Sequence, residues 1–181
     1  MVLNDILVAI RLKRLSAALR LTNFFFQRVV GINSNCPWQV HFTSVVSDPQ
    51  NIKVHPSVYL SFAVSGNCYI QGKNGIEIGE GTIFAPGVRI ISANHSPGNL
   101  DTHEKDPPVR IGRNCWIAVN AVILPGVTIE DNVVVGAGSV VTKSFSEGSV
   151  IAGVPARLIR TVGSPQEPVV LESLDDNAPD H

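Results

Sequence analysis

The 181-residue sequence has few aromatic side chains, no long apolar run and almost no net charge. Aromatic residues make up 6% of the chain, so Val and Ile must build most of the core of what is expected to be one domain. The formal net charge is −1 and no basic stripe is present, which argues against binding to nucleic acid through its phosphates. No stretch is apolar for long enough to span a bilayer.

Cysteine is also scarce. Cys36, Cys68 and Cys115 form no CxxC pair and leave an odd number of thiols. This usage favours reduced thiols in a cytoplasmic protein. The N-terminus shows no signal-peptide cleavage pattern, which supports the same localisation.

Residues 1–35 are predicted to form an N-terminal helical segment, because apolar residues recur there with helical spacing between several Arg and Lys residues. We expect this segment to dock on the protein's own domain, and weak contact with an anionic membrane surface is the functional alternative. The run from Leu21 to Val30 is unusually apolar and is expected to be buried. Residues 31–57 are predicted to be an irregular lead-in.

A six-residue repeat occupies the middle of the chain. From Ile111 it runs IGRNCW, IAVNAV, ILPGVT, IEDNVV, VGAGSV, VTKSFS, with Ile or Val at every first position and a small or β-branched residue at most fifth positions. A second block begins at Ile78 with IGEGTI, FAPGVR, IISANH. A third begins at Val58 with VYLSFA, VSGNCY, IQGKNG, and its offset from the second block indicates a two-residue insertion within residues 74–77.

Six residues accommodate one short strand and one turn, and three such units close a triangular coil. Successive coils stack with parallel strands about 4.8 Å apart, and the first-position side chains then form ladders inside. Gly and Asn near the corners supply unusual backbone angles. A sandwich of short strands would instead require alternation with period two. Periodicity alone does not give the hand of the coil.

Two segments interrupt or follow the repeats. Residues 96–108, SPGNLDTHEKDPP, contain three prolines and are predicted to protrude as a functional loop. The repeats end after Val141, where SVIAGVPARLIR predicts a closing strand, a turn and a terminal segment. Residues 161–181 form an acidic, Pro-containing tail that we expect to be flexible. The β-helix domain itself is predicted to span residues 36–160.

The hexads, the excursion after Asn94 and His95, the run NCWIAVNAVILPGVTIEDNVVVGAGSVVTKSF and the ending VIAGVPARLI resemble the hexapeptide-repeat acetyltransferases. The nearest groups are the maltose and galactoside O-acetyltransferases and the colanic acid and O-antigen polysaccharide acetyltransferases. The resemblance implies a mainly β fold, a left-handed parallel β-helix, and a homotrimer with each active site between two subunits. It also implies acetyl-CoA as co-substrate and a sugar hydroxyl of a surface-polysaccharide precursor as acceptor.

Acetyl transfer to a hydroxyl requires a base, and histidine suits this role because its ordinary pKa is about 6.5. His95 ends the hexad IISANH, where the scaffold passes into the excursion, and the family's catalytic histidine occupies this place. We therefore predict His95 as the general base and Asn94 as a residue that orients the acceptor or the imidazole. His103, within the excursion, is expected to be a solvated loop residue.

By position-by-position resemblance, a second group of residues is expected to line the acetyl-CoA groove: Trp116, Val119, Ala137, Thr142, Lys143, Arg157 and Arg160. Ala137 and Thr142 would offer backbone contacts to the pantetheine arm. Lys143, Arg157 and Arg160 would contact the phosphates. Val119 departs from the polar residue of some relatives.

Three other functions remain open at this stage. A γ-type carbonic anhydrase needs three histidine ligands for zinc, and no third histidine follows in the later hexads, so no metal is expected. A non-catalytic scaffold would need neither a base nor a basic cluster. An N-acetyltransferase acting on an amino-sugar nucleotide would use the same machinery.

Overall fold

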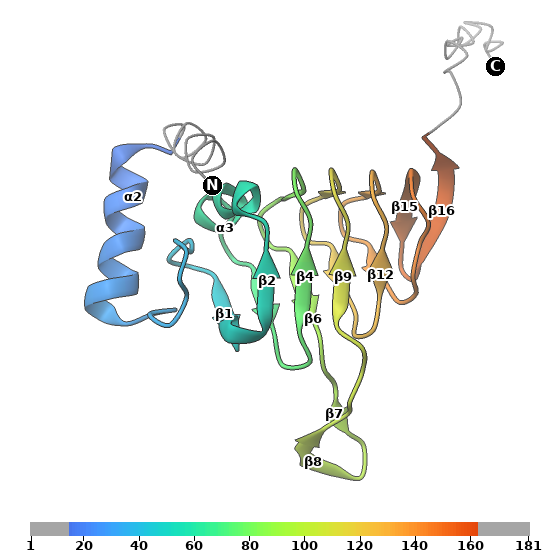
Figure 1. The fold of residues 1–181 in the computed structure, drawn as a ribbon, viewed down its shortest axis with the longest axis horizontal. Coiled ribbons are helices and arrows are strands. Elements are labelled where there is room, and N and C mark those ends of the chain that lie inside the picture. The colour runs from blue at the N-terminus through green and yellow to red at the C-terminus, as the bar shows by residue number, and fades with distance from the viewer. Residues whose placement is uncertain (1–14, 163–181) are drawn as a thin grey trace, which may run out of the picture.

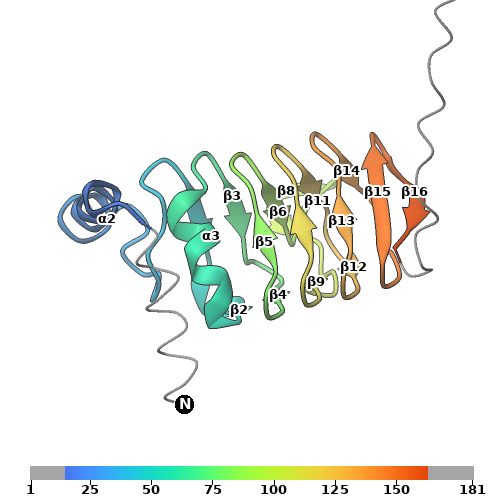
Figure 2. The same cartoon turned by 90° about the horizontal axis from the view of Figure 1, so that it is seen from above.

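The computed structural model describes residues 15–162, and within them the chain winds through three parallel sheets that form the sides of a triangular prism (Figures 1 and 2). Sheet A contains β1 (Val45–Ser47), β3 (Tyr69–Gln71), β6 (Arg89–Ile91), β11 (Val122–Ile123) and β14 (Val140–Val141). Sheet B contains β2 (Ile52–Val54), β4 (Ile76–Ile78), β9 (Val109–Ile111) and β12 (Thr128–Ile129). Sheet C contains β5 (Ile83–Phe84), β10 (Trp116–Ile117), β13 (Val134–Val135), β15 (Ser149–Gly153) and β16 (Ala156–Thr161).

Successive strands enter sheets A, B and C in turn, so each three-strand circuit is one coil of a parallel β-helix. The β-helix is left-handed. The predicted fold class is confirmed. The register carries each first-position residue onto its equivalent in the next coil: Ile90 pairs with Ile123, and Ile123 with Val141. In sheet C, Ile117 pairs with Phe84 on one side and Val135 on the other.

The ladders form the core. All six first-position residues from Ile111 to Val141 are buried, as are the fifth-position residues Cys115, Ala121, Val127, Val133 and Ser139. Burial of these aliphatic stacks is the main favourable term in the stability of the coil. The predicted two-residue insertion lies in the turn between β3 and β4, at residues 72–75.

Two corners of the prism position the candidate site. Corner AB is the set of turns that follow the strands of sheet A (residues 72–75, 92–95, 124–127 and 142–144). Corner CA is the set of turns that follow the strands of sheet C (residues 85–88, 118–121 and 136–139). At corner CA, Gly87 and Asn120 adopt positive φ of 73° and 58°, and the Asn120 side chain fills the space that a Cβ on Gly87 would need.

The first hexad of the third block is an incorrect prediction. VYLSFA, residues 58–63, starts at the last residue of the helical turn η3 (Pro56–Val58) and contains most of the helix α3 (Tyr59–Val64), where a strand was expected. Val58, Phe62 and Ala63 are buried, and this spacing is helical. The helix covers the end of sheet C beside β5, where the Ser61 hydroxyl accepts a hydrogen bond from Phe84 N–H at 3.3 Å. The lead-in is also less irregular than expected, because β1 and β2 already form most of a coil.

Residues 17–30 are helical, as predicted, with α2 (Ala17–Phe24) continuing into the π-helical segment η1 (Phe25–Val30). They lie beside the N-terminal end of the coil (Figure 1). The expectation that residues 21–30 are buried is wrong, since Leu21, Phe24, Phe25, Val29 and Val30 are all exposed. Predictions made for residues 1–14 and for the tail beyond residue 162 lie outside the described residues. Among the described residues, no helix combines the length and apolar character needed to cross a bilayer.

The excursion projects from corner AB as an antiparallel hairpin of β7 (His95–Ser96) and β8 (Asn99–His103) (Figure 1). It protrudes as predicted, but as paired strands. At the other end of the coil, β16 folds back antiparallel on β15, which closes sheet C with the predicted strand and turn.

Candidate active site

His95 stands at the root of the hairpin, where the last residues of the β6 turn leave the prism. Its side chain is exposed, and its Nδ1 lies 2.6 Å from the backbone carbonyl oxygen of Leu100. A carbonyl oxygen only accepts hydrogen bonds, so Nδ1 carries the proton of the neutral ring. The Nε2 atom of His95 is then the unprotonated nitrogen of the neutral ring, which can act as a base.

The His103 ring lies against the His95 ring with centroids 4.3 Å apart, because the two residues face each other across the hairpin. Partial burial lowers the pKa of His103, and the positive charges of Lys73 and His95 lower it further. The expectation of a merely solvated loop histidine overlooked this contact. The signal in the sequence was two histidines on either side of the turn-forming residues Pro97, Gly98 and Asn99.

The hairpin is anchored through the residues around Asn94. The Asn94 carbonyl accepts a hydrogen bond from Glu104 N–H at 3.0 Å, and the Glu104 carbonyl accepts one from the Asn74 side chain at 2.9 Å. Gln71 Oε1 accepts a third from Ala93 N–H at 3.0 Å. The Asn94 side chain is exposed beside His95 and φ of this residue is not positive, so Asn94 is not a left-handed corner residue.

Thr142 and Lys143 lie at corner AB, like His95. The register of sheet A stacks Thr142 above Leu124 and Leu124 above Ile91, from which the chain continues to the hairpin. Both side chains are exposed, and Lys143 Nζ lies 5.6 Å from the centroid of the Phe145 ring.

Trp116, Val119 and Ala137 lie along sheet C and corner CA. Trp116 is 52% exposed on the outer face of β10, and Val119 and Ala137 are exposed in successive turns of the corner. The Val119 carbonyl accepts a hydrogen bond from Gly138 N–H at 2.9 Å, which stacks these two turns directly on each other. Arg157 and Arg160 are exposed on β16, at the C-terminal end of the same sheet.

One chain therefore does not gather all the predicted residues. His95, Asn94, Thr142 and Lys143 share corner AB, whereas Trp116, Val119, Ala137, Arg157 and Arg160 belong to sheet C and corner CA on the other side of sheet A. A single active site that uses both groups needs corner AB of one chain to face corner CA of another.

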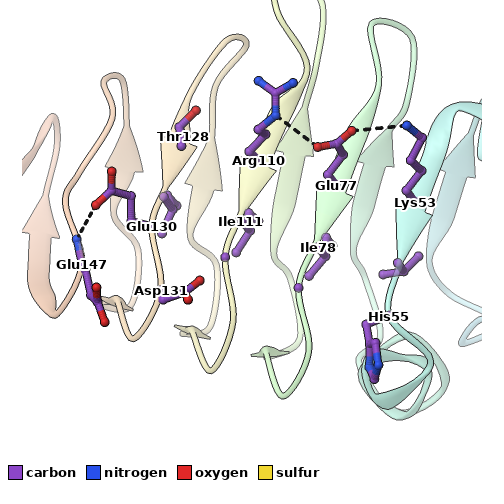
Figure 3. A pocket seen from close by; sticks show the side chains of 14 residues that line it. Lys53, His55, Glu77, Ile78, Arg110, Ile111, Thr128, Glu130, Asp131 and Glu147 are labelled. Carbon is purple, nitrogen blue, oxygen red and sulfur yellow. Dashed lines mark hydrogen bonds and ion pairs between the residues drawn. The ribbon is translucent and has the colours of Figure 1, made fainter. Parts of the chain in front are cut away.

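A shallow depression on the outer face of sheet B was not anticipated (Figure 3). Glu77 lines it and pairs with Arg110 at 3.1 Å and with Lys53 at 3.5 Å. These bonds lower the pKa of Glu77. None of the predicted site residues lines the depression. Within residues 15–162, no group of three or more His, Cys, Asp or Glu side chains is arranged to hold a metal ion.

Known proteins share both the repeat and the fold. The family model described as bacterial transferase hexapeptide (six repeats) matches residues 108–143. The galactoside O-acetyltransferase of Escherichia coli K12 is 37% identical over 127 residues, which cover 62% of this chain and 62% of that protein. The chain thus spans about three fifths of the length of this curated relative.

Solved structures of acyltransferases are also similar to this chain in fold. A maltose O-acetyltransferase from Clostridium difficile 630 is 28% identical with a TM-score of 0.51, and the match covers 87% of this chain and 89% of that one. The N-acyltransferase AntD from Bacillus cereus, at 17% identity and a TM-score of 0.51 over 71% of this chain and 82% of that one, shares the fold. In its hexad register, its sheet order and these similarities, the chain is similar to the hexapeptide-repeat acetyltransferases.

Proposed function

We propose that this protein transfers an acetyl group from acetyl-CoA to a hydroxyl group of a sugar, with His95 as the general base. The observation that carries the proposal is the exposed His95 side chain at the root of the hairpin, whose Nδ1 is held by the Leu100 carbonyl at 2.6 Å so that Nε2 is left as the basic nitrogen. The similarity to galactoside and maltose O-acetyltransferases supports the choice of donor group and acceptor class.

In the proposed reaction, Nε2 of His95 takes the proton of the acceptor hydroxyl as its oxygen attacks the acetyl carbonyl carbon. The bond between that carbon and the CoA sulfur then breaks, and the thiolate receives the proton from the imidazolium. A charged His103 beside His95 would oppose the imidazolium. The lowered pKa of His103 keeps that neighbour neutral at neutral pH.

Acetyl-CoA is proposed to lie along sheet C and corner CA, where Trp116, Val119 and Ala137 are exposed. Arg157 and Arg160 at the C-terminal end of this surface, with Lys143 from corner AB, supply the positive charge that the phosphates of CoA require. The depression on sheet B is less suited, because the carboxylates of Glu77, Glu130, Asp131 and Glu147 line it and would repel phosphates.

A homotrimer would bring the two groups of residues into one site. The outer faces support contact between subunits: sheet C exposes Ile83 and Trp116, and sheet A exposes Val45 and Tyr69, whereas sheet B carries the ion pairs of Glu77. Exposed apolar surface of this kind is typical of subunit interfaces.

An acceptor screen tests the proposal. Purified protein is mixed with acetyl-CoA and single acceptors, and free thiol is followed with time. We expect thiol release above the hydrolysis rate with galactosides, maltose or a surface-polysaccharide precursor, and an acetylated sugar by mass spectrometry. Preference for an amino sugar would identify N-acetyl transfer instead. If the protein fails to bind acetyl-CoA in calorimetry and turns over no acceptor, the alternative of a non-catalytic binding scaffold would be favoured.

A further inference from the structure

The helix formed by α2 and η1 at the N-terminal end of the coil packs its polar side against the body of the protein. Asn23 and Gln27, one turn apart, are 0% and 4% exposed. The Asn23 amide donates to the Ala63 carbonyl at 2.9 Å and accepts from Phe42 N–H at 3.1 Å. The Gln27 amide donates to the Trp38 carbonyl at 2.9 Å and accepts from Val40 N–H at 3.2 Å. Hydrogen bonds of two satisfied amides therefore hold the helix on the body of the protein.

The opposite side of this helix is apolar and faces outward. It consists of Leu21, Phe24, Phe25 and Val29, which recur with helical spacing and are 69%, 57%, 50% and 67% exposed. We call these four residues the outer helix face. A surface helix of a globular domain normally turns its apolar stripe to the core, and within residues 15–162 nothing covers this face, so its orientation indicates a partner beyond these residues.

Charge narrows the choice of partner. Arg20 and Arg28 are exposed next to the outer helix face, since each lies four residues from Phe24 in the helix. The sequence contains no Asp or Glu between Asp5 and Asp48. A second copy meeting this face through its own outer helix face would bring arginines together without a carboxylate from this segment to pair them.

The helix also lies away from the surfaces that are expected to contact other subunits. It lies at the end of the prism, whereas sheets A and C form two of its sides (Figures 1 and 2). The exposed apolar residues of these sheets, such as Val45 and Ile83, therefore lie away from the helix. Cyclic packing through the sides would leave the end free and would place three copies of the helix on one side of the assembly. Several weak surface contacts presented together bind far more tightly than one.

We propose that the outer helix face docks the protein on the surface of an anionic phospholipid bilayer. Phe and Leu side chains would enter the boundary between headgroups and acyl chains, and Arg20 and Arg28 would pair with lipid phosphates. The docking itself does not depend on the acetyl-transfer chemistry. Its role rests on the proposed function, because it would hold the site close to sugar acceptors that are carried on lipids.

Vesicle co-sedimentation of the full chain tests the proposal. One set of vesicles is pure phosphatidylcholine, and the other contains about one third phosphatidylglycerol. We expect binding to the anionic vesicles that weakens as salt is added. Phe24→Ser with Phe25→Ser is expected to lower the partition coefficient at least about tenfold, and Arg20→Glu to lower it about fivefold. Val154→Ser, which removes a 71% exposed apolar side chain at the opposite end of the coil, is the matched control and should bind like the wild type.

Two further measurements on the same samples separate the outcomes. Light scattering gives the oligomeric mass, and thiol release with a free sugar gives the activity, which the double serine variant should retain. Wild-type protein that stays in the supernatant of anionic vesicles overturns the proposal, whether or not it is active. Equal binding by the double serine variant overturns it too. A lower oligomeric mass in that variant, with no vesicle binding by the wild type, would assign the face to a second copy.

Discussion

His95 combines a hydrogen-bonded ring with an exposed side chain, and both properties come from its place at the end of a rigid coil. The register of β6 fixes where the chain leaves the prism, and the hairpin returns the Leu100 carbonyl to Nδ1. The hexad pattern predicted where the chain leaves the prism, because it places His95 at the edge of the scaffold. The hexad pattern could not predict the contact between the Leu100 carbonyl and Nδ1. This contact and the pairing of His95 with His103 depend on how thirteen non-repeating residues fold back.

Removal of the imidazole at position 95 is the most direct test at this scale. His95→Ala should lower kcat by at least about 100-fold in the thiol-release assay, because it removes the proposed general base. The oligomeric mass should be unchanged, since the apolar contacts proposed between subunits come from side chains of sheets A and C such as Val45 and Ile83. His55→Asn, which alters a histidine on the sheet B side, is the matched control and should keep near-normal turnover. Near-normal turnover of His95→Ala would reject the role.

The cationic side chains proposed to bind CoA can be tested in the same way. Lys143→Ala with Arg157→Ala should raise the KM for acetyl-CoA about tenfold or more, because each removes a charge-assisted contact to phosphate. Thermal unfolding should shift little, since both side chains are exposed. Lys53→Ala with Arg110→Ala removes two cations from the depression on sheet B and should leave the KM unchanged. The reverse pattern would move the CoA site to sheet B.

At the scale of elements, the stacked strands illustrate what periodicity can and cannot predict. Hexads from Ile111 to Val141 predicted every inward side chain, because each coil repeats the environment of the one before it. The segment from Val58 to Val64 was mistaken for a hexad because Val58 and Val64 are both apolar and six residues apart. Val64 is exposed, and burial instead follows the helical spacing of Val58 and Phe62. A short apolar run fits either template.

The sheet A ladder should carry much of the stability of the coil. Ile123 is fully buried between Ile90 and Val141, so Ile123→Ala should lower the free energy of unfolding by about 2–5 kcal/mol through lost burial and a cavity. Its neighbour Val122 points outward in the same strand, and Val122→Ala should cost less than about 1 kcal/mol. Urea unfolding of both variants gives the comparison. Equal losses would mean that the ladder does not dominate the stability of the coil.

Acid should lower the free energy of unfolding, because two histidines have lowered pKa values in the folded chain. Burial lowers the pKa of His41, and partial burial with the charges of Lys73 and His95 lowers that of His103, from an ordinary value of 6.5. The unfolded chain therefore binds more protons below pH 6.5, so stability is full above that pH and declines as pH falls through the lowered values. His103→Asn should reduce the loss measured by urea unfolding between neutral and mildly acidic pH. An unchanged pH dependence would contradict this contribution.

For the whole molecule, the distribution of outward side chains separates the three sides of the prism. Sheet B carries Lys53, Glu77 and Arg110, whose ion pairs suit a solvent-facing side. Sheets A and C expose apolar residues that flank corner CA. This difference cannot be read from the ladders, because the hexad pattern specifies only the inward residues. The difference between the sides follows from the outward-facing residues of each strand, once the register has assigned each strand to a sheet.

If sheet C faces a neighbouring subunit, a charge placed there should separate the subunits. Ile83 is 50% exposed on the outer face of β5, so Ile83→Glu should leave the coil folded but bury an unpaired carboxylate in the interface. We expect light scattering after gel filtration to show a trimer for the wild type and a monomer for this variant, with acetyl transfer lost as the two corners separate. Thr128→Glu, on the outer face of sheet B, should remain trimeric and active. A monomeric wild type with full activity would show that one chain completes the site.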